Sequence, residues 1–366
     1  MPASDPRLVA VEWARLEGLR PRPAGSNARL GPHGDRTTIH LARLTTEDGT
    51  TGFGASYVTP AQAERLLGAR LGDLFSVAAG PNPTALPFEY PLWDLAGTLS
   101  GRPVYALAME RFGLSAPASY RAPCYDTSLY FDDLALASDA DAGALLADEA
   151  RAGYARGHRA FKLKVGRGAR HMPLEEGTRR DIAIVRAVRA ALGPGWPLLL
   201  DANNGYNLNL AKRVLAETAD CDVFWLEEPF HEDPVLYRDL REWLAANNLP
   251  VLIADGEGQA SPRLLDWARD GLIDVVQLEI YGLGFSGWLN TGQQLDAWGA
   301  RGAPHHYGTH YGNYVACHLA GAIRNFAYVE WDEAVTPGAM WPMRKTRSLS
   351  CSPMPPASLM WCVSAM

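Results

Sequence analysis

The stretch AFKLKVG, residues 160–166, places two lysines in a short apolar run of the kind that forms a buried strand. Side chains two residues apart on a strand point to the same face, so Lys162 and Lys164 would lie side by side. The chain has 34 lysines and arginines but only four lysines, and two of the four stand here. Arginine keeps its proton in proteins, whereas the pKa of a buried or crowded lysine shifts readily. The strand therefore predicts an amine that acts as a base.

Similar apolar runs recur from about residue 120 onward and alternate with segments whose apolar residues have helical spacing. Eight strands joined by helices indicate an α/β fold built on a parallel (β/α) barrel, which we favour over a doubly wound open sheet. The predicted strands are APCYDTSLYF (122–131), AFKLKVG (160–166), PLLLDANN (197–204), VFWLEEPF (223–230), VLIADGEG (251–258), VVQLEIYG (275–282), GAPHHYG (302–308) and YVEWDE (328–333).

The amino-terminal part follows a different pattern. TTIHLARLTTEDGTTGFG (37–54) predicts a β-hairpin that turns at Asp48–Gly49. The next segment begins with Thr59, Pro60 and Gln62, which is the signature of a helix N-terminus with a capping box. A small α+β domain is therefore expected ahead of the barrel.

Two segments depart from regular patterns. LRPRPAGSNARLGPHG (about 19–34) is rich in Pro, Gly and Arg and predicts a mobile loop that closes over a site. The last segment, 334–366, shows neither strand alternation nor helical periodicity and is compositionally atypical. We therefore expect an α+β capping domain at 1–118, a barrel at 119–333 and an atypical tail at 334–366.

Bulk composition excludes several classes of protein. The net charge of −7 and the absence of a Lys/Arg cluster argue against a nucleic-acid partner. No apolar run is long enough to span a membrane, and the amino terminus lacks the apolar core of a signal peptide. The five cysteines are scattered without a C-x-x-C pair, which is typical of reduced thiols. We therefore expect a cytoplasmic protein.

Polar residues recur late in the predicted strands, where the catalytic groups of a parallel barrel lie. From Asp201 onward they follow one another at steps of 26, 30, 22, 26 and 25 residues, close to one strand–helix unit each. A single acid in such a place is often a helix cap or part of an ion pair, but a series in register favours a site. Its members are Lys162, Lys164, Asp201, Glu227, Glu257, Glu279, His305 and Glu330.

Three successive strands supply Asp201, Glu227 and Glu257, an oxygen-only set that suits Mg²⁺, with Mn²⁺ as a substitute, and suits zinc poorly. A salt-bridge network with the two lysines is the alternative interpretation, but three acids exceed what two lysines neutralise. Asp255, in the same ADGE stretch as Glu257, stays a rival third ligand.

The histidine-rich stretch PHHYGTH (304–310) follows the seventh predicted strand. Glu279, one strand earlier, can hold one ring nitrogen of His305, which fixes the tautomer and raises the basicity of the other nitrogen. His306 stays an alternative for this role. The glycines of GLGFSG (282–287) match a dinucleotide-binding pattern, but the next strand ends without the acid such a site needs, so they indicate a tight turn.

The ordered combination resembles the enolase superfamily and, within it, the mandelate racemase subgroup. The matching stretches are FKLKVG, DANNGY, WLEEPF, GEG, PHHYG and YVEWDE, and the similarity extends from about residue 8 to 333. The resemblance implies a modified (β/α)7β TIM-type barrel, an α+β capping domain that carries a specificity loop, one Mg²⁺ per subunit and a homo-oligomer, from dimer to octamer.

The resemblance also assigns roles. Asp201, Glu227 and Glu257 would bind Mg²⁺. Lys164 would remove the proton α to a substrate carboxylate, giving an enediolate, and the charge of Lys162 would lower the pKa of Lys164. Further roles concern the opposite face and the substrate: His305 oriented by Glu279 as acid or base, Glu330 hydrogen-bonded to the substrate carboxylate, and Asn203, Arg20 and His306 as substrate contacts.

The implied activity is dehydration of an acid sugar, an aldonate or aldarate, to a 2-keto-3-deoxy acid. A racemase or epimerase of a 2-hydroxy acid is the enzymatic alternative, and a catalytically inactive barrel is the non-enzymatic one. Glu279 stands where relatives usually have Asp. The chain has no lysine between 213 and 344, which disfavours muconate-lactonising chemistry. Arginines in the predicted loop suggest a second carboxylate on the substrate.

Overall fold

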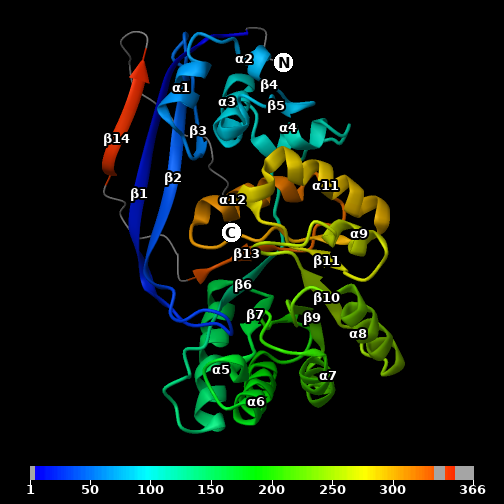
Figure 1. Cartoon of the computed structure of the whole chain (residues 1–366). Coiled ribbons are helices and arrows are strands. Elements are labelled where there is room, and N and C mark those ends of the chain that lie inside the picture. The colour runs from blue at the N-terminus through cyan, green and yellow to red at the C-terminus, as the bar shows by residue number, and fades with distance from the viewer. Residues whose placement is uncertain (1–4, 334–342, 351–366) are drawn as a thin grey trace.

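The computed structural model describes residues 5–333 and 343–350, and two long strands connect its upper and lower parts in Figure 1. The upper part is a four-stranded antiparallel sheet with helices on it, and the lower part is a parallel sheet surrounded by helices. None of the helices in the described part of the chain combines the length and apolar character of a membrane span.

The antiparallel sheet has the strand order β14-β1-β2-β3. The β2–β3 hairpin confirms the predicted turn, in which Asp48 accepts hydrogen bonds from the Thr50 backbone at 3.0 Å and the Thr46 hydroxyl at 2.6 Å. The strands are β1 (Leu8–Ala24), β2 (Gly34–Thr46), β3 (Thr51–Ala55) and β14 (Met343–Ser350), with a small separate pair, β4 (Phe75–Ser76) and β5 (Gly80–Pro81).

Helices cover this sheet and join it to the barrel. The first of them begins with the predicted capping box, in which Thr59 and Gln62 bond reciprocally. Trp93 and Leu95 of α3 are fully buried against β3 and the neighbouring helices. The helices are α1 (Pro60–Leu66), α2 (Leu71–Leu74), the 3-10 turn η1 (Leu86–Phe88), α3 (Glu89–Ser100) and α4 (Val104–Glu110).

Two expectations for irregular segments need correction. The predicted loop at about 19–34 is shorter, because β1 continues to Ala24, which pairs with Gly34, and only residues 25–33 connect the strands. Part of the tail, 343–350, forms β14 and pairs antiparallel with β1. The edge of β1 offers unpaired backbone groups that a passing segment can satisfy. The rest of the predicted tail, 334–342 and 351–366, lies outside the described residues.

The parallel sheet has eight strands in the order β12-β11-β10-β9-β8-β7-β6-β13. Hydrogen bonds from Gly302 to Asn325 at 3.1 Å and from Ala327 to Gly302 at 2.8 Å join the last strand region to β12, so the sheet closes on itself. The strands are β6 (Cys124–Leu129), β7 (Phe161–Lys164), β8 (Leu198–Asp201), β9 (Val223–Glu227), β10 (Leu252–Asp255), β11 (Val275–Val276), β12 (Arg301–Gly302) and β13 (Val329–Trp331).

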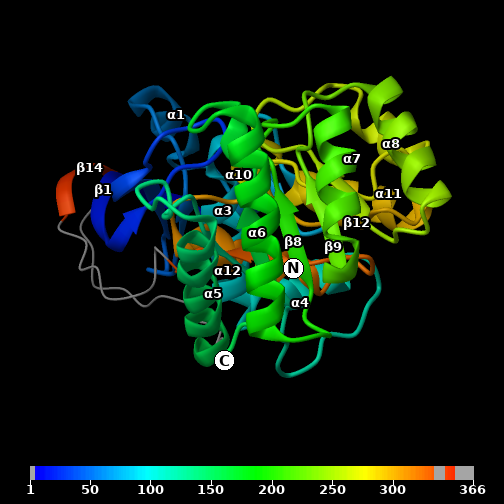
Figure 2. The same ribbon diagram turned by 90° about the horizontal axis from the view of Figure 1, so that it is seen from below.

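Each of the seven connections between these strands contains a helix, which confirms the predicted (β/α)7β barrel. Figure 2 shows α5, α6, α7 and α8 side by side on the outside of the sheet. The helices are α5 (Asp139–Arg156), α6 (Leu174–Leu192), α7 (Leu208–Glu217), α8 (Pro234–Ala246), α9 (Leu264–Arg269), α10 (Ile280–Leu283), α11 (Phe285–Trp298) and α12 (His310–Ala320), with 3-10 turns η2 (Arg167–Ala169) and η3 (Ala219–Cys221).

The barrel interior changes character along its axis. Below the strand ends it is apolar and aromatic, with Tyr125, Leu199 and Trp225 in one buried cluster. Above that cluster the same strands carry charged side chains, since residues two apart share a face. The polar groups therefore lie at the carboxyl ends of the strands.

Candidate active site

The two lysines of β7 lie side by side, as their spacing predicts, and each contacts carboxylates of neighbouring strands. The fully buried Lys162 Nζ lies 2.6 Å from Glu227 Oε1 and 2.9 Å from Glu330 Oε1. Lys164 Nζ donates a hydrogen bond to Asp201 Oδ2. The ring of Tyr125 lies below Lys162, 5.0 Å from Nζ.

Asp201, Glu227 and Glu257 form the candidate metal centre. Their carboxylates offer oxygen atoms that all lie within 4.8 Å of one another at the ends of β8, β9 and β10. Burial and the nearby charge of Asp201 raise the pKa of Glu227 to about 8, a sign of excess negative charge. A dication would offset that charge, and an all-oxygen set suits Mg²⁺.

Asp255, the rival third ligand, is engaged elsewhere. Its Oδ2 accepts a hydrogen bond from the Tyr237 hydroxyl at 2.5 Å, and its Oδ1 accepts one from the Gly256 backbone at 2.7 Å. Glu257, two residues later, meets the other two acids instead. The geometry therefore favours Glu257 over Asp255 as the third ligand.

His305 and Glu279 form a pair on the opposite side of the acid cluster. His305 Nδ1 lies 2.7 Å from Glu279 Oε1, and His305 Nε2 lies 3.2 Å from Glu257 Oε2. Burial alone would lower the pKa of His305, but the surrounding carboxylates, led by Glu257 and Glu330, raise it to about 10. The imidazolium therefore has a proton to give.

His306 lies differently, although it is the next residue. Its ring nitrogen Nε2 bonds the carbonyl oxygen of Thr309, and the ring packs edge-on against Tyr281 at 5.1 Å. Burial lowers the pKa of His306 to about 4. Of the two histidines, His305 is the one that contacts Glu279, and the ring of His306 is a packed, neutral group.

Glu330 is held by several donors. Its Oε1 accepts from Thr127 Oγ1 at 2.9 Å and meets Lys162, while its Oε2 accepts from the His306 backbone at 3.2 Å. Burial opposes ionisation, but the charges of Lys162 and His305 hold the pKa of Glu330 below its usual range. Glu330 thus lies between Lys162 and His305, and its expected hydrogen bond to a substrate carboxylate stays a prediction.

Lys162 was expected to lower the pKa of Lys164, but a second neighbour has a larger influence on that pKa. Burial and the charge of Lys162 do lower the pKa of Lys164, but the adjacent Asp201 carboxylate raises it above its ordinary value. The neighbouring acid therefore decides the charge of this amine, and the neighbouring lysine is a smaller influence.

The three residues expected to contact the substrate lie in different surroundings. Asn203 lies in the site, where its amide nitrogen donates to Glu228 and to Glu257, both at 3.0 Å. Arg20 belongs to β1 and lies 3.3 Å from Asp332, and both side chains are almost fully buried. Because that ion pair neutralises its charge, Arg20 is no longer a candidate for binding a substrate carboxylate, and the packed ring of His306 is not one either.

Three residues around the site were not predicted from the sequence. Trp225 Nε1 donates to Glu227 Oε2 at 3.1 Å, and its place two residues before the acid on one strand face was a usable signal. Glu228, in the same LEEPF stretch, is 2% exposed and accepts from Asn203 and Asn204. Thr127 gave no signal, since a lone threonine in a strand is ordinary.

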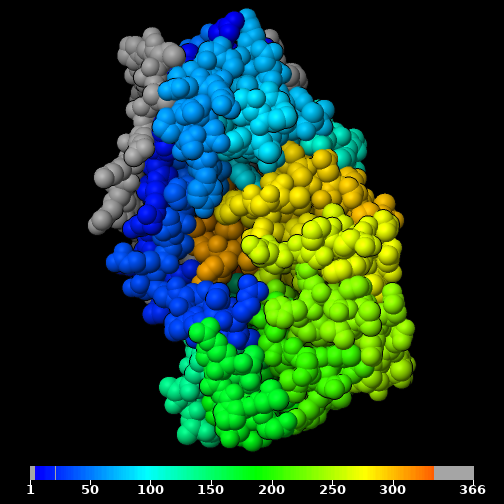
Figure 3. Space-filling model, in the orientation of Figure 1, coloured from blue at the N-terminus to red at the C-terminus, as the bar shows by residue number. Residues whose placement is uncertain are grey.

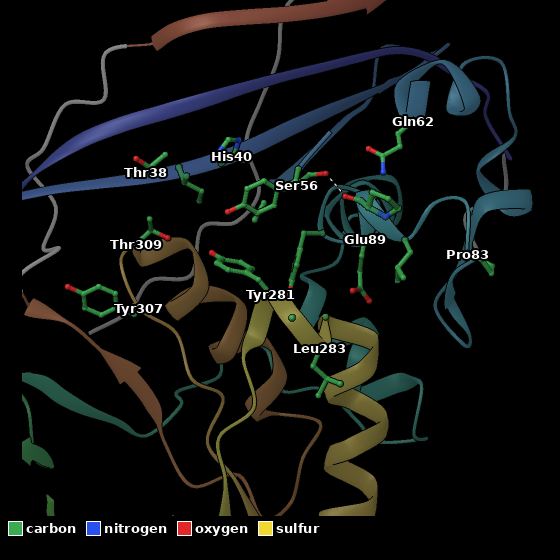
Figure 4. A pocket seen from close by; sticks show the side chains of 18 residues that line it. Thr38, His40, Ser56, Gln62, Pro83, Glu89, Tyr281, Leu283, Tyr307 and Thr309 are labelled. Atoms are coloured by element: carbon green, nitrogen blue, oxygen red, sulfur yellow. Dashed lines mark hydrogen bonds between the residues drawn. The ribbon is translucent and has the colours of Figure 1, made fainter. Parts of the chain in front are cut away.

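A hollow separates the antiparallel sheet from the barrel (Figure 3). It includes a cavity of about 580 Å³ between the β2–β3 hairpin and α10, with His40, Ser56, Tyr281, Tyr307 and Thr309 among its walls (Figure 4). Tyr307 and Thr309 of its wall belong to the stretch PHHYGTH, which also contains His305.

Comparisons with known proteins agree with this arrangement. A family model described as enolase C-terminal domain-like matches residues 145–348. A variant of galacturonate dehydratase from Geobacillus sp., solved in complex with Mg, is 49% identical, with a TM-score of 0.87 over 93% of this chain and 87% of that one. The same enzyme was solved with D-galacturonate and 5-keto-4-deoxy-D-galacturonate, with a TM-score of 0.85 over 92% and 88% of the two chains, at 49% identity.

Curated relatives are more distant. D-galactarolactone cycloisomerase of Agrobacterium fabrum is 27% identical over 300 residues, which are 75% of this chain and 72% of that protein. D-gluconate/D-galactonate dehydratase of Picrophilus torridus is 27% identical over 199 residues, 53% of this chain and 45% of that protein. The matching family model, the barrel and the neighbouring structures agree, and the chain belongs to the enolase superfamily, through its enolase C-terminal domain-like family.

Proposed function

We propose that this protein catalyses the Mg²⁺-dependent dehydration of an acid sugar to a keto-deoxy acid. One observation carries the proposal: two groups suited to proton transfer contact the same acid cluster, and each contacts a different carboxylate. Lys164 contacts Asp201, and His305 contacts Glu257. D-galacturonate is the first substrate to test, since the Geobacillus enzyme was solved with this acid.

Each residue has a separate part in the proposed reaction. Lys164 removes the proton from the carbon next to the carboxylate, and the electrons of that C–H bond move toward the carboxylate, giving an enediolate. In a second step these electrons form a C=C double bond as the neighbouring C–O bond breaks. His305 gives its proton to the departing hydroxyl, which leaves as water, and the enol that remains becomes a ketone. Glu279 holds His305 in the orientation that this transfer needs.

Asp201, Glu227 and Glu257 would hold the metal. Bound Mg²⁺ would take up negative charge on the substrate carboxylate and would offset the charge of Asp201, which favours the neutral form of Lys164. Lys162 stays charged between Glu227 and Glu330 and holds both carboxylates in place. Asn203 orients Glu257 through its amide.

The experiment is proton NMR of D-galacturonate with the protein in D₂O, with Mg²⁺ and with EDTA. We expect Mg²⁺-dependent loss of the acid and the appearance of a keto-deoxy product. Conversion that continues at the same rate in EDTA would contradict the metal requirement. No conversion of D-galacturonate or of a panel of other aldonic, uronic and aldaric acids would contradict the proposed activity.

Epimerisation of a hydroxy acid is the second candidate. The observation that favours it is the presence of proton-transfer groups on two sides of the cluster, because one could remove the α-proton while the other returns it. In the same NMR experiment, exchange of the α-proton for deuterium with every hydroxyl retained would indicate this activity.

We also propose the finer points that the family resemblance implies. These are a capping domain at 1–118 and a barrel at 119–333, a cytoplasmic location and a homo-oligomer between dimer and octamer. Light scattering of the purified protein measures the last of these directly.

A further inference from the structure

Trp225 stands two residues before the proposed metal ligand Glu227, on the same face of β9. Its indole nitrogen Nε1 donates a hydrogen bond to Glu227 Oε2 at 3.1 Å, and both side chains are fully buried. The N–H group of a buried tryptophan needs an acceptor, and a hydrogen bond to a carboxylate is stronger than one to a neutral oxygen. The donor of this indole is therefore bonded to a proposed metal ligand.

The carboxylate of Glu227 is held at both of its oxygen atoms. Lys162 Nζ lies 2.6 Å from Oε1, and Trp225 holds Oε2. The last torsion of a glutamate side chain has broad preferences, so the side chain does not fix the plane of its own carboxylate. The two donors together fix this plane, and one of them, the indole, carries no charge.

Neutral donors also hold the other two proposed ligands. Asp201 Oδ1 accepts a hydrogen bond from the Asn203 backbone at 2.9 Å, and Glu257 Oε1 accepts one from the Asn203 amide at 3.0 Å. A neutral N–H group orients a carboxylate without neutralising its charge, so the carboxylate keeps its attraction for a dication. Trp225 supplies such a donor to the third ligand, Glu227.

The indole ring is itself held by aromatic side chains inside the barrel. Its centroid lies 5.5 Å from that of Tyr125 at an interplanar angle of 89°, and 5.9 Å from that of Tyr328 at 68°. Both are edge-to-face contacts, which aromatic rings favour. Lys162 Nζ lies 5.0 Å from the centroid of Tyr125, so both groups that hold Glu227 pack against the same ring. The indole N–H therefore has a fixed position.

We infer that Trp225 is a positioning residue of the metal centre, whose indole N–H fixes the plane of the Glu227 carboxylate and thereby raises the affinity for Mg²⁺. The inference rests on the proposed function, because the metal belongs to it. Residues that hydrogen-bond to metal ligands set the orientation of those ligands, and their loss typically lowers metal affinity about 10- to 100-fold. The role of Trp225 is thus expected to appear in Mg²⁺ binding even without a substrate.

Two substitutions of Trp225 separate the hydrogen bond from the packing. Trp225→Phe keeps a six-membered ring but has no donor, whereas Trp225→His keeps an N–H group, Nε2, at the place of Nε1 in a five-membered ring and loses more volume. Calorimetric titration of protein freed of metal with EDTA measures the Kd for Mg²⁺. We expect this Kd to rise about 10- to 100-fold in Trp225→Phe and much less in Trp225→His. The melting temperature should fall more in Trp225→His, because that variant leaves the larger cavity.

Trp288→Phe is the matched control. Trp288 of α11 is also fully buried, and within the described part of the chain its Nε1 has no hydrogen-bond partner. The substitution removes a similar volume but no hydrogen bond, so the Kd for Mg²⁺ should stay close to that of the wild type. A purely structural role of Trp225 would make Mg²⁺ affinity follow the melting temperature, with Trp225→His the weaker binder. That order would overturn the inference.

A second measurement uses the wild type, with ¹⁵N at the tryptophan indoles. An N–H group bonded to a metal ligand senses the charge that binds there. We expect one indole signal that is protected from solvent exchange to shift in step with Mg²⁺ saturation, and the same signal to be absent from Trp225→Phe. A wild type in which no protected indole signal moves would overturn the inference even if no variant folds.

The proposed function would fail in a different way. No Mg²⁺ binding by the wild type would contradict the metal centre itself. Mg²⁺ binding with equal affinity in the wild type and in Trp225→Phe would contradict only the role of Trp225.

Discussion

At the scale of single residues, the charges of the site are balanced only incompletely by its own side chains. Asp201, Glu227, Glu257 and Glu330 face Lys162, Lys164 and His305, and most of these groups are buried. The pKa of Glu227 is raised to about 8, while that of Glu330 is held low, so the acids share the available positive charge unequally. Isolated buried charge is costly, and a bound dication removes this imbalance.

The choice between Glu257 and Asp255 gives the first prediction. Glu257→Gln should weaken Mg²⁺ binding at least tenfold, because an amide is a weaker ligand than a carboxylate, and should change the melting temperature little. Asp255→Asn, the matched control, should keep the Mg²⁺ affinity but lower the melting temperature, since Asp255 bonds Tyr237 and Gly256. Calorimetric titration with Mg²⁺ measures the affinities, and the reverse pattern would show that Asp255 is the ligand.

The sequence alone predicts which residues lie at this site, but it does not predict which of them are charged. The strand-end spacing predicts that Lys162, Lys164 and the three acids converge, because barrel strands end at one face. It could not show that Asp201 outweighs Lys162 at Lys164, nor that Arg20 is paired with Asp332, since both depend on distances between segments far apart in the chain.

At the scale of elements, the segment that follows β7 is fastened by one buried arginine. Arg167 Nη2 lies 2.6 Å from Asp133 Oδ1 and Nη1 lies 2.7 Å from Asp181 Oδ1, with all three side chains fully buried. Arg167 Nη1 also donates to the carbonyl of Lys164 at 3.1 Å. The proposed base is thus attached to α6 through this arginine.

Arg167→Met should therefore be strongly destabilising. The change leaves Asp181 buried without its cation and leaves Asp133 with only Arg180, 3.8 Å away. Breaking a buried pair in this way costs about 3–5 kcal/mol. Denaturant unfolding should show a clearly lower midpoint. Arg213→Met, which removes an exposed guanidinium from Glu175 and Glu217, is the control and should leave the midpoint nearly unchanged. Equal midpoints for the two variants would contradict the structural role of Arg167.

A second buried ion pair joins the end of β13 to the segment before β7. His158 Nε2 bonds Glu333, and Asp126 lies nearby. Burial by itself would lower the pKa of His158, but contacts with Cys124 and Glu333 and the charge of Asp126 raise it to about 10. This folded-state pKa exceeds the unfolded value of about 6.5, so the histidine stabilises the fold below that pH and the contribution fades as the pH rises toward 10.

The pH dependence of the stability follows from the direction of this pKa shift. The melting temperature of the wild type should exceed that of His158→Gln by a few degrees at pH 6, and the difference should shrink steadily up to pH 10. Calorimetric scans at several pH values measure it. A difference that is the same at pH 6 and pH 10 would show that the charge of His158 contributes nothing.

The elements themselves were largely predictable where local signals are strong. The capping box at Thr59 and the turn at Asp48–Gly49 both occur, because they depend on bonds between near neighbours. The stretch from 19 to 24 was expected in a loop, yet it continues β1, because its pairing with β2 at both ends overrides the Pro-rich composition. The strand at 343–350 likewise depends on a distant partner.

At the scale of the whole molecule, the antiparallel part is joined to the barrel close to the His305 side of the site. Tyr90 of α3 donates to the Ile280 carbonyl at 2.6 Å, directly after Glu279, and Glu89 accepts from the Ser286 backbone at 2.7 Å at the start of α11. The connection between β1 and β2 is bonded to the segments that follow β6 and β7. The antiparallel part is thus bonded to several of the segments that follow the barrel strands.

The central claim is that Lys164 and His305 act on different steps, and hydrogen–deuterium exchange at the α-carbon separates them. The measurement is proton NMR in D₂O with Mg²⁺ and the acid sugar that the wild type dehydrates. Lys164→Arg keeps a positive charge but cannot act as a base, so it should neither exchange the α-proton nor dehydrate. His305→Asn should exchange the α-proton while the hydroxyl stays.

Lys212→Arg, in which a partly exposed lysine paired with Asp239 is changed in the same way, is the control and should behave as the wild type. Exchange without dehydration in His305→Asn, together with no exchange in Lys164→Arg, is the predicted result. Exchange or dehydration by Lys164→Arg at the wild-type rate would show that Lys164 is not the base.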